Sequence, residues 1–166
     1  MLGVKWGTRA VGAAARIYPS AVVTVRREMN ASAATVWAVL ADGWLYPSWV
    51  VGASRMREVD PAWPGVGAQL HHSVGTWPLL VNDTTTVHVC VPKRELVLRG
   101  RAWPMGGAEV RLTLEDHGGG CEVVMSEEAR SGPARLIPPP ARSVLIGPRN
   151  TETLRRLAYL AEAESR

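Results

Sequence analysis

Among the residues that could hold or transfer a proton, His72 stands in a short segment that is predicted to form a strand. Leu70 and Val74 flank it at a spacing of two, and His71 takes the opposite phase. Because successive side chains of a strand point to opposite faces, an inner apolar face carries His72 with it and leaves His71 outside. An imidazole in this position could accept or donate a proton near neutral pH.

The same spacing rule places two carboxyl groups on the inner face of neighbouring segments. Asp83 and Thr85 share the spacing of two of one set of valines and so point the same way. Glu127 shares the spacing of a second apolar set, whereas Glu128 points outward. The apolar residues that set these two faces are Val81, Val87, Val89, Val123 and Met125.

Asn150 completes the polar set, since helical phasing back from Leu154 and Leu157 puts it on a buried stripe. A buried polar group without a partner costs about 1 to 3 kcal/mol, so all four side chains must form hydrogen bonds. One interpretation is that they bind a ligand carbonyl or hydroxyl, with His72 and Glu127 as catalytic proton-transfer groups if the protein is an enzyme. The other is that they satisfy one another or the backbone, which would favour a passive binding protein.

Seven tryptophans and no phenylalanine occur in the chain, and three of the tryptophans stand where loops would border a cavity. Trp49 ends a short helical segment, while Trp77 and Trp103 each precede a proline at a strand boundary. Such side chains can offer a flat apolar face to a ligand while the indole N–H stays in water, although they can equally anchor loops to the core. Trp37 lies on an apolar helical stripe and is expected in the core.

Several other kinds of site are not expected from this sequence. His71 and His72 point to opposite faces and the other histidines lack ligand spacing, so we expect no metal site. The stretch 65–67 lacks the third glycine and the following helix of a dinucleotide-binding loop, and no Gly-x-Ser-x-Gly nucleophile sequence is present. We therefore expect no cofactor, and neither hydrolase nor dehydrogenase activity.

The net charge of +4 arises in residues 1–30, which hold five basic residues and one acidic residue. The rest of the chain is balanced, so we expect no binding to nucleic acid. Residues 1–19 are expected to form a weakly structured extension. No apolar run approaches the roughly 18 residues of a membrane span, and two isolated cysteines suit a reducing cytoplasm, so we expect a cytoplasmic protein. The sequence leaves the oligomeric state open.

At 166 residues, of which 46% are hydrophobic and 20% charged, the chain is expected to form a single domain over residues 20–164. The patterns predict a strand at 21–29, a helix from Ser32 to near Gly43, a short helical segment at 44–50 and an amphipathic helix at 151–163. Pro148 either begins this last helix or lies within a longer one. Glycines and prolines divide the intervening chain into six strands, near 53–60, 68–74, 79–90, 94–102, 107–116 and 121–130.

In this order, four passages resemble the START-like, Bet v 1-like superfamily, which is also described as polyketide cyclase/dehydrase and lipid transport proteins. They are residues 30–42, 46–49, 65–68 and 149–157, and the resemblance spans about residues 20–164. The Ala, Gly and Arg bias resembles an actinobacterial member. The resemblance implies an α+β helix-grip fold, in which a curved antiparallel seven-stranded sheet wraps around a long C-terminal helix, with two short helices after strand 1 and an internal cavity.

Three functional hypotheses follow. The first is a binding protein for a hydrophobic or polycyclic small molecule, such as a lipid, isoprenoid or polyketide-like compound, held by Trp49, His72, Trp77, Asp83, Trp103, Glu127 and Asn150. The second is a polyketide cyclase, aromatase or dehydratase that uses the same cavity, because some members of the superfamily do chemistry there and fold alone does not decide function. The third, motivated by the basic N-terminal residues, is an interaction module for a partner enzyme.

Overall fold

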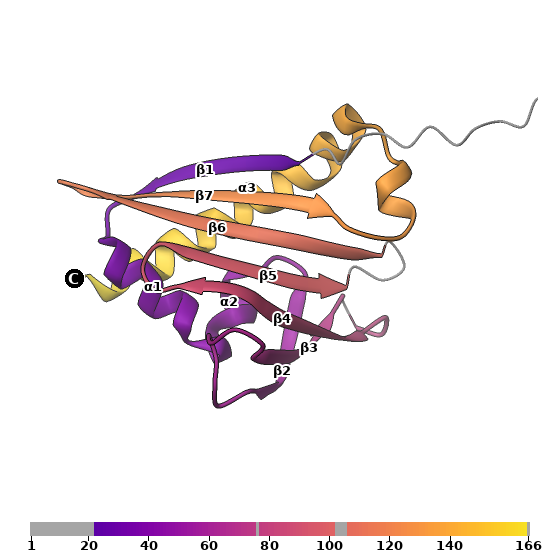
Figure 1. Ribbon diagram of the computed structural model, residues 1–166, viewed down its shortest axis with the longest axis horizontal. Coiled ribbons are helices and arrows are strands. Elements are labelled where there is room, and N and C mark those ends of the chain that lie inside the picture. The colour runs from indigo at the N-terminus through magenta and orange to yellow at the C-terminus, as the bar shows by residue number, and fades with distance from the viewer. Residues whose placement is uncertain (1–21, 76, 102–105, 166) are drawn as a thin grey trace, which may run out of the picture.

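A seven-stranded antiparallel sheet and one long helix, α3, make up most of the computed structural model, which describes residues 22–75, 77–101 and 106–165. The sheet has the order β1-β7-β6-β5-β4-β3-β2, and α3 runs along one of its faces (Figure 1). The elements are β1 (Val23–Met29), α1 (Ala33–Ala41), the 3-10 helix η1 (Gly43–Leu45), α2 (Tyr46–Trp49), β2 (Ala53–Val59), β3 (Gln69–Val74), β4 (Val81–Val91), β5 (Glu95–Arg101), β6 (Gly107–His117), β7 (Gly120–Ala129), η2 (Pro133–Leu136) and α3 (Pro139–Glu164).

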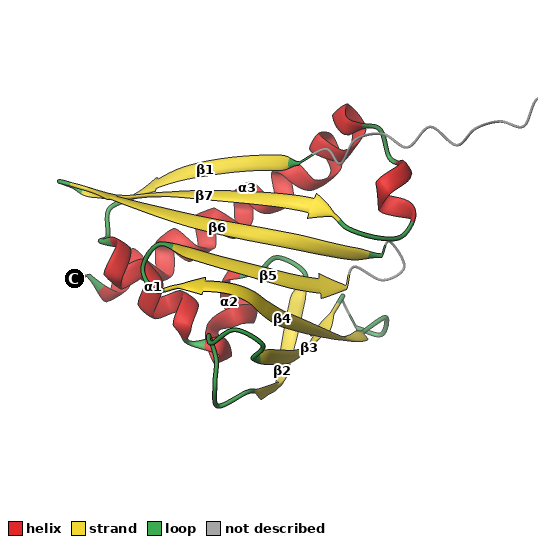
Figure 2. Cartoon of the chain, in the orientation of Figure 1, coloured by secondary structure: helices red, strands yellow, loops and turns green. Residues whose placement is uncertain are grey.

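This arrangement confirms the predicted α+β helix-grip fold, with two short helical segments after the first strand (Figure 2). Every predicted strand is present, with bounds that differ by at most two residues. The predicted N-terminal extension, residues 1–19, lies outside the described residues.

Helix α1 begins where the sequence predicts because Ser32 caps it. The Ser32 Oγ accepts a hydrogen bond from the Thr35 backbone N–H at 3.2 Å, which satisfies one of the free donors of the first turn. Asp116 Oδ1 accepts another from the Ala33 N–H at 3.1 Å and ties the helix to the end of β6. Trp37 is buried on the inner side of α1, as predicted.

Helix α3 is anchored mainly by its C-terminal half. Pro148 lies inside the helix, so the longer of the two predicted helices is the one observed. Proline has no backbone N–H and removes one hydrogen bond from the helical ladder. The buried residues of α3 are Arg142, Asn150, Thr153, Leu154, Leu157, Ala158 and Ala161, and all but the first follow Pro148.

The inner face of the sheet changes in side-chain size from one end to the other. Towards α1 it carries large residues, among them Leu96, Leu112, Leu114 and Val123. We call the opposite end of the sheet, with the turns at 74–81 and 129–139, the η2 end. At this end the inner face of β5 and β6 carries only the small residues Gly100 and Ala108, which pair directly with each other. Because a packed interior needs side chains that meet, space remains under α3 at the η2 end.

One inward assignment from the sequence is wrong. The register of β4 against β5 shifts between Val87 and Val89, so that Cys90, and not Val89, packs against the core. A bulge adds one residue to a strand and reverses the alternation beyond it. Asp83 and Thr85 precede the bulge in the chain, so the change of face does not affect them. Both point inward as predicted and are buried.

Candidate functional site

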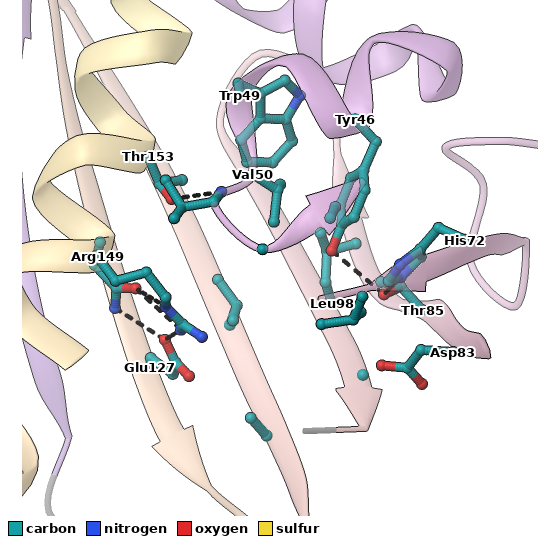
Figure 3. A pocket seen from close by; sticks show the side chains of 18 of the residues that line it. Tyr46, Trp49, Val50, His72, Asp83, Thr85, Leu98, Glu127, Arg149 and Thr153 are labelled. Carbon is teal, nitrogen blue, oxygen red and sulfur yellow. Dashed lines mark hydrogen bonds and ion pairs between the residues drawn. The ribbon is translucent and has the colours of Figure 1, made fainter. Parts of the chain in front are cut away.

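A cavity of about 130 Å³ lies between the inner face of the sheet and α3. Helix α2 and the turn at 50–52 close it on the side away from β7 (Figure 3). Its apolar wall is formed chiefly by Trp49, Val50, Val74, Leu98, Val110 and Met125. Polar side chains enter from two directions and form two separate clusters.

The first cluster is built around Thr85 on β4 and includes Tyr46, His72 and Asp83. The Thr85 hydroxyl is 2.9 Å from His72 Nε2 and 3.3 Å from the Tyr46 hydroxyl, and Figure 3 shows the three groups meeting on one wall of the cavity. Burial raises the pKa of Tyr46 above its ordinary value of 10, so the phenol stays protonated. Asp83 Oδ1 accepts a hydrogen bond from the neighbouring Thr84 N–H at 2.7 Å.

Burial also controls the charge of His72, which is 3% exposed. Removal from water lowers its pKa below the ordinary value of 6.5, and the nearby Asp83 offsets only part of this effect. The imidazole is therefore neutral at pH 7.

We expect the stability of the protein to fall as the pH drops below about 6.5. The unfolded chain takes up a proton on His72 at a higher pH than the folded chain does, so stability is complete above the unfolded pKa and is lost as the pH falls towards the lower, folded value. His72→Asn should flatten this dependence in urea unfolding measured between pH 5 and 8. His88→Asn, at an exposed position of β4, is the control, and a flattening equal to that of His72→Asn would contradict the assignment to His72.

The second cluster consists of Glu127 on β7 and of Arg149 and Asn150 on α3. Asn150 Nδ2 donates to Glu127 Oε2 at 2.9 Å, and Arg149 makes an ion pair with the same oxygen. The Arg149 Nη2 also donates to Asn150 Oδ1 at 3.1 Å, so the three side chains bond in a closed ring. Glu127 and Asn150 are buried, while the Arg149 side chain is 40% exposed.

A second cavity, of about 200 Å³, lies on the other side of this cluster beneath the first turns of α3. Its walls include Ile137, Leu145 and Ile146. Ala108, Glu127 and Arg149 line both cavities. The Glu127–Arg149 pair therefore lies at the border between the two cavities.

Five of the seven sequence-predicted site residues come together around the first cavity: Trp49, His72, Asp83, Glu127 and Asn150. No hydrogen bond joins His72, Asp83 and Glu127 to one another; each bonds instead to a neighbouring group. Trp77 is 85% exposed in the β3–β4 turn and does not line the cavity. Trp103 lies outside the described residues.

Trp49 lines the cavity, but not as a wet rim residue. It is 2% exposed, and its Nε1 is buried without a hydrogen-bond partner in the described part of the chain. The predicted solvated indole N–H is therefore wrong at this position. The reason is that α2 folds over the cavity, with the Tyr46 ring set edge-on to Trp49 at 5.3 Å between ring centres.

Tyr46 and Arg149 are site residues that the sequence reasoning missed. Tyr46 precedes Trp49 by three residues, a spacing that puts both on one side of a helical turn and could have pointed to it. Arg149 carries no such signal, because its long side chain reaches Glu127 from outside the buried stripe.

Two features are absent from the ranges that the structure describes. No three His, Cys, Asp or Glu side chains gather there as they would to hold a metal ion. None of the helices in these ranges has the length and apolar character needed to cross a lipid bilayer.

Several solved structures have the same architecture as this chain, although their sequences are no more than 22% identical to it. The Zhui aromatase/cyclase from Streptomyces sp. R1128 is 16% identical, with a TM-score of 0.67 over 89% of this chain and 97% of that one. A protein of Rhodobacter sphaeroides is 22% identical, with a TM-score of 0.66 over 89% and 98%. Ara h 8.0201 is 11% identical, with a TM-score of 0.62 over 86% and 98%. At these identities the likeness establishes the fold alone.

Sequence comparison with curated proteins gives no significant match. The family model described as polyketide cyclase / dehydrase and lipid transport matches residues 20–162, which is most of the chain. The interior cavity, the helix-grip architecture and this match agree with one another. The chain belongs to the polyketide cyclase / dehydrase and lipid transport family.

Proposed function

We propose that the protein binds a hydrophobic small molecule of lipid, isoprenoid or polyketide type in the cavity between the sheet and α3. The observation that carries this proposal is the cavity itself. Its floor is left open by Gly100 and Ala108, and its wall is mostly apolar with a few convergent polar groups. The family description, which names lipid transport as well as polyketide chemistry, supports the same substrate class.

The volume of the cavity limits how a ligand can fit. About 130 Å³ is close to the roughly 150 Å³ of an engineered apolar cavity that holds benzene, so one ring or a short chain fills the first cavity. A longer or polycyclic ligand must also occupy the second cavity, and its path passes the Glu127–Arg149 pair. A hydroxyl or carbonyl on such a ligand would meet one of the two polar clusters.

Titration with flat aromatic and lipid-like probes tests this proposal. Because Trp49 is buried in the cavity wall, bound probes should change the tryptophan emission in a saturable manner. Native mass spectrometry of the purified protein would report a retained ligand directly. Absence of saturable binding across both the aromatic and the lipid probes would contradict the proposal.

A second candidate is an enzyme of the cyclase, aromatase or dehydratase type. It is favoured by one observation: His72 and Glu127 face the same cavity from different strands and do not pair with each other. A neutral His72 could then accept a proton from an acidic C–H of a bound polyketone. Turnover of a candidate polyketone that persists unchanged in the double variant His72→Ala, Glu127→Gln would exclude these roles.

A further inference from the structure

The η2 end of the molecule carries large apolar side chains in water. The most prominent are Trp77 and Leu79 in the β3–β4 turn, and Leu136, Val144 and Leu145 in η2 and the first turns of α3. Their exposed fractions run from 63% for Leu136 to 85% for Trp77. Leu80, Val81 and Val22 at the same end are also exposed. Exposed apolar residues that stand singly are ordinary, whereas a group of them marks a surface that binds something.

These segments belong to one end of the sheet although they are far apart in the sequence. Val74 pairs with Val81 at the β3–β4 turn, and Ala108 pairs with Ala129 where β7 leads into η2. Since the sheet is antiparallel throughout, both turns lie at the same end of the strands (Figure 1). The other exposed large apolar residues in the described ranges, Trp44, Val66, Val91 and Tyr159, lie elsewhere.

The charges at this end are positive. Residues 129–151 contain four arginines and no acidic residue, and residues 74–82 contain no charge at all. Arg135, in η2, is exposed and makes no ion pair with the described residues. The acidic side chains nearest to these turns on β6 and β7, Glu109, Glu127 and Glu128, are each paired with an arginine. Arg130 and Arg149 take part in these ion pairs, and Arg142 is buried. The positive charge that residues 129–151 offer to an anionic partner beside the apolar surface is therefore that of Arg135.

The apolar surface is also continuous with the interior. Leu145 is 67% exposed and at the same time lines the second cavity, so this cavity reaches the surface at the η2 end. Protruding turns and a helix end that combine Trp, Leu and Val with arginine are typical of segments that enter the headgroup region of a membrane.

We propose that the η2 end docks on the surface of an anionic lipid bilayer, with Trp77, Leu79, Leu136 and Val144 entering the interface. This inference goes beyond the proposed ligand binding, because the docking surface consists of exposed side chains and needs no ligand in the cavity. Arg135 adds an electrostatic attraction to anionic headgroups.

Co-sedimentation with vesicles tests the proposal without any added ligand. The full chain should sediment with vesicles of phosphatidylcholine and phosphatidylglycerol in equal amounts, and much less with phosphatidylcholine alone or at high salt. The triple variant Leu79→Ser, Leu136→Ser, Val144→Ser should bind the anionic vesicles at least about tenfold more weakly. The matched control, Trp44→Ser, Val66→Ser, Tyr159→Ser, replaces three apolar residues elsewhere that are also at least 60% exposed, and it should bind as the wild type does.

A second measurement does not depend on the stability of a triple variant. In vesicles that contain brominated phosphatidylcholine, the fluorescence of the wild type should be quenched, and Trp77→Leu should lose part of that quenching. The proposal is overturned if the wild type does not bind anionic vesicles, if both triple variants bind alike, or if Trp77 is not quenched. Capture of an acidic protein by the η2 end in place of vesicle binding would likewise overturn it.

Discussion

Replacing Ala108 with phenylalanine should weaken ligand binding by roughly a hundredfold or more while the protein stays folded. Ala108 lines both cavities and lies opposite Gly100 on the floor of the sheet, so a phenyl ring at this position fills space that is empty in the wild type. A larger side chain that enters an existing cavity does not overpack the core in the way that one added to a filled region does. Probe titration gives the affinity, and thermal unfolding verifies the fold.

The matched control is Ala141→Phe. Ala141 is exposed in the first turn of α3 and lines neither cavity, so the same substitution there should leave affinity unchanged. If Ala108→Phe binds the probes as tightly as the wild type, the ligand lies somewhere other than between the sheet and α3.

Glu127→Val should lower the free energy of unfolding by about 2 to 3 kcal/mol. The substitution leaves the buried Asn150 Nδ2 without its acceptor and removes the carboxylate that Arg149 contacts. The loss should stay below that of a fully buried ion pair, because the Arg149 side chain is 40% exposed and water screens its charge. Urea unfolding at pH 7 measures the change as a shift of the midpoint.

Two further variants show whether the ring of hydrogen bonds is responsible. Glu128→Val removes the neighbouring carboxylate, which is on the outer face and pairs with Arg130 at 3.2 Å, and should change stability by only about 0.5 kcal/mol. Combining Glu127→Val with Asn150→Leu should recover part of the loss, since apolar replacement of both partners leaves no orphaned polar atom. Equal losses in Glu127→Val and Glu128→Val would contradict this explanation.

The inward direction of His72, Asp83 and Glu127 could be predicted because each stands in a regular stretch of strand, where the period of two holds. The same rule failed at Val89, because a bulge reverses the alternation there and no residue in the sequence indicates that bulge. The strand bounds followed from glycines and prolines, which restrict the backbone locally. Local rules thus recover the elements and most of their faces.

The shape of the site depends on information that local rules lack. The cavity exists because Gly100 pairs with Ala108, a register that only the assembled sheet defines. Trp49 is buried because α2 folds over the cavity, and Arg149 belongs to the site because of the reach of its side chain. Each of these depends on distances between elements that are distant in sequence.

The position of Pro148 and the unequal burial along α3 have a consequence for local unfolding. Residues 150–161 open only when the whole core opens, because they hold nearly all the buried positions of the helix. Residues 139–147 contribute one buried side chain and adjoin a proline that interrupts the ladder, so their amides exchange with solvent at a lower free energy. Because this segment walls the second cavity, its local opening would expose that cavity to solvent while the rest of the protein remains folded.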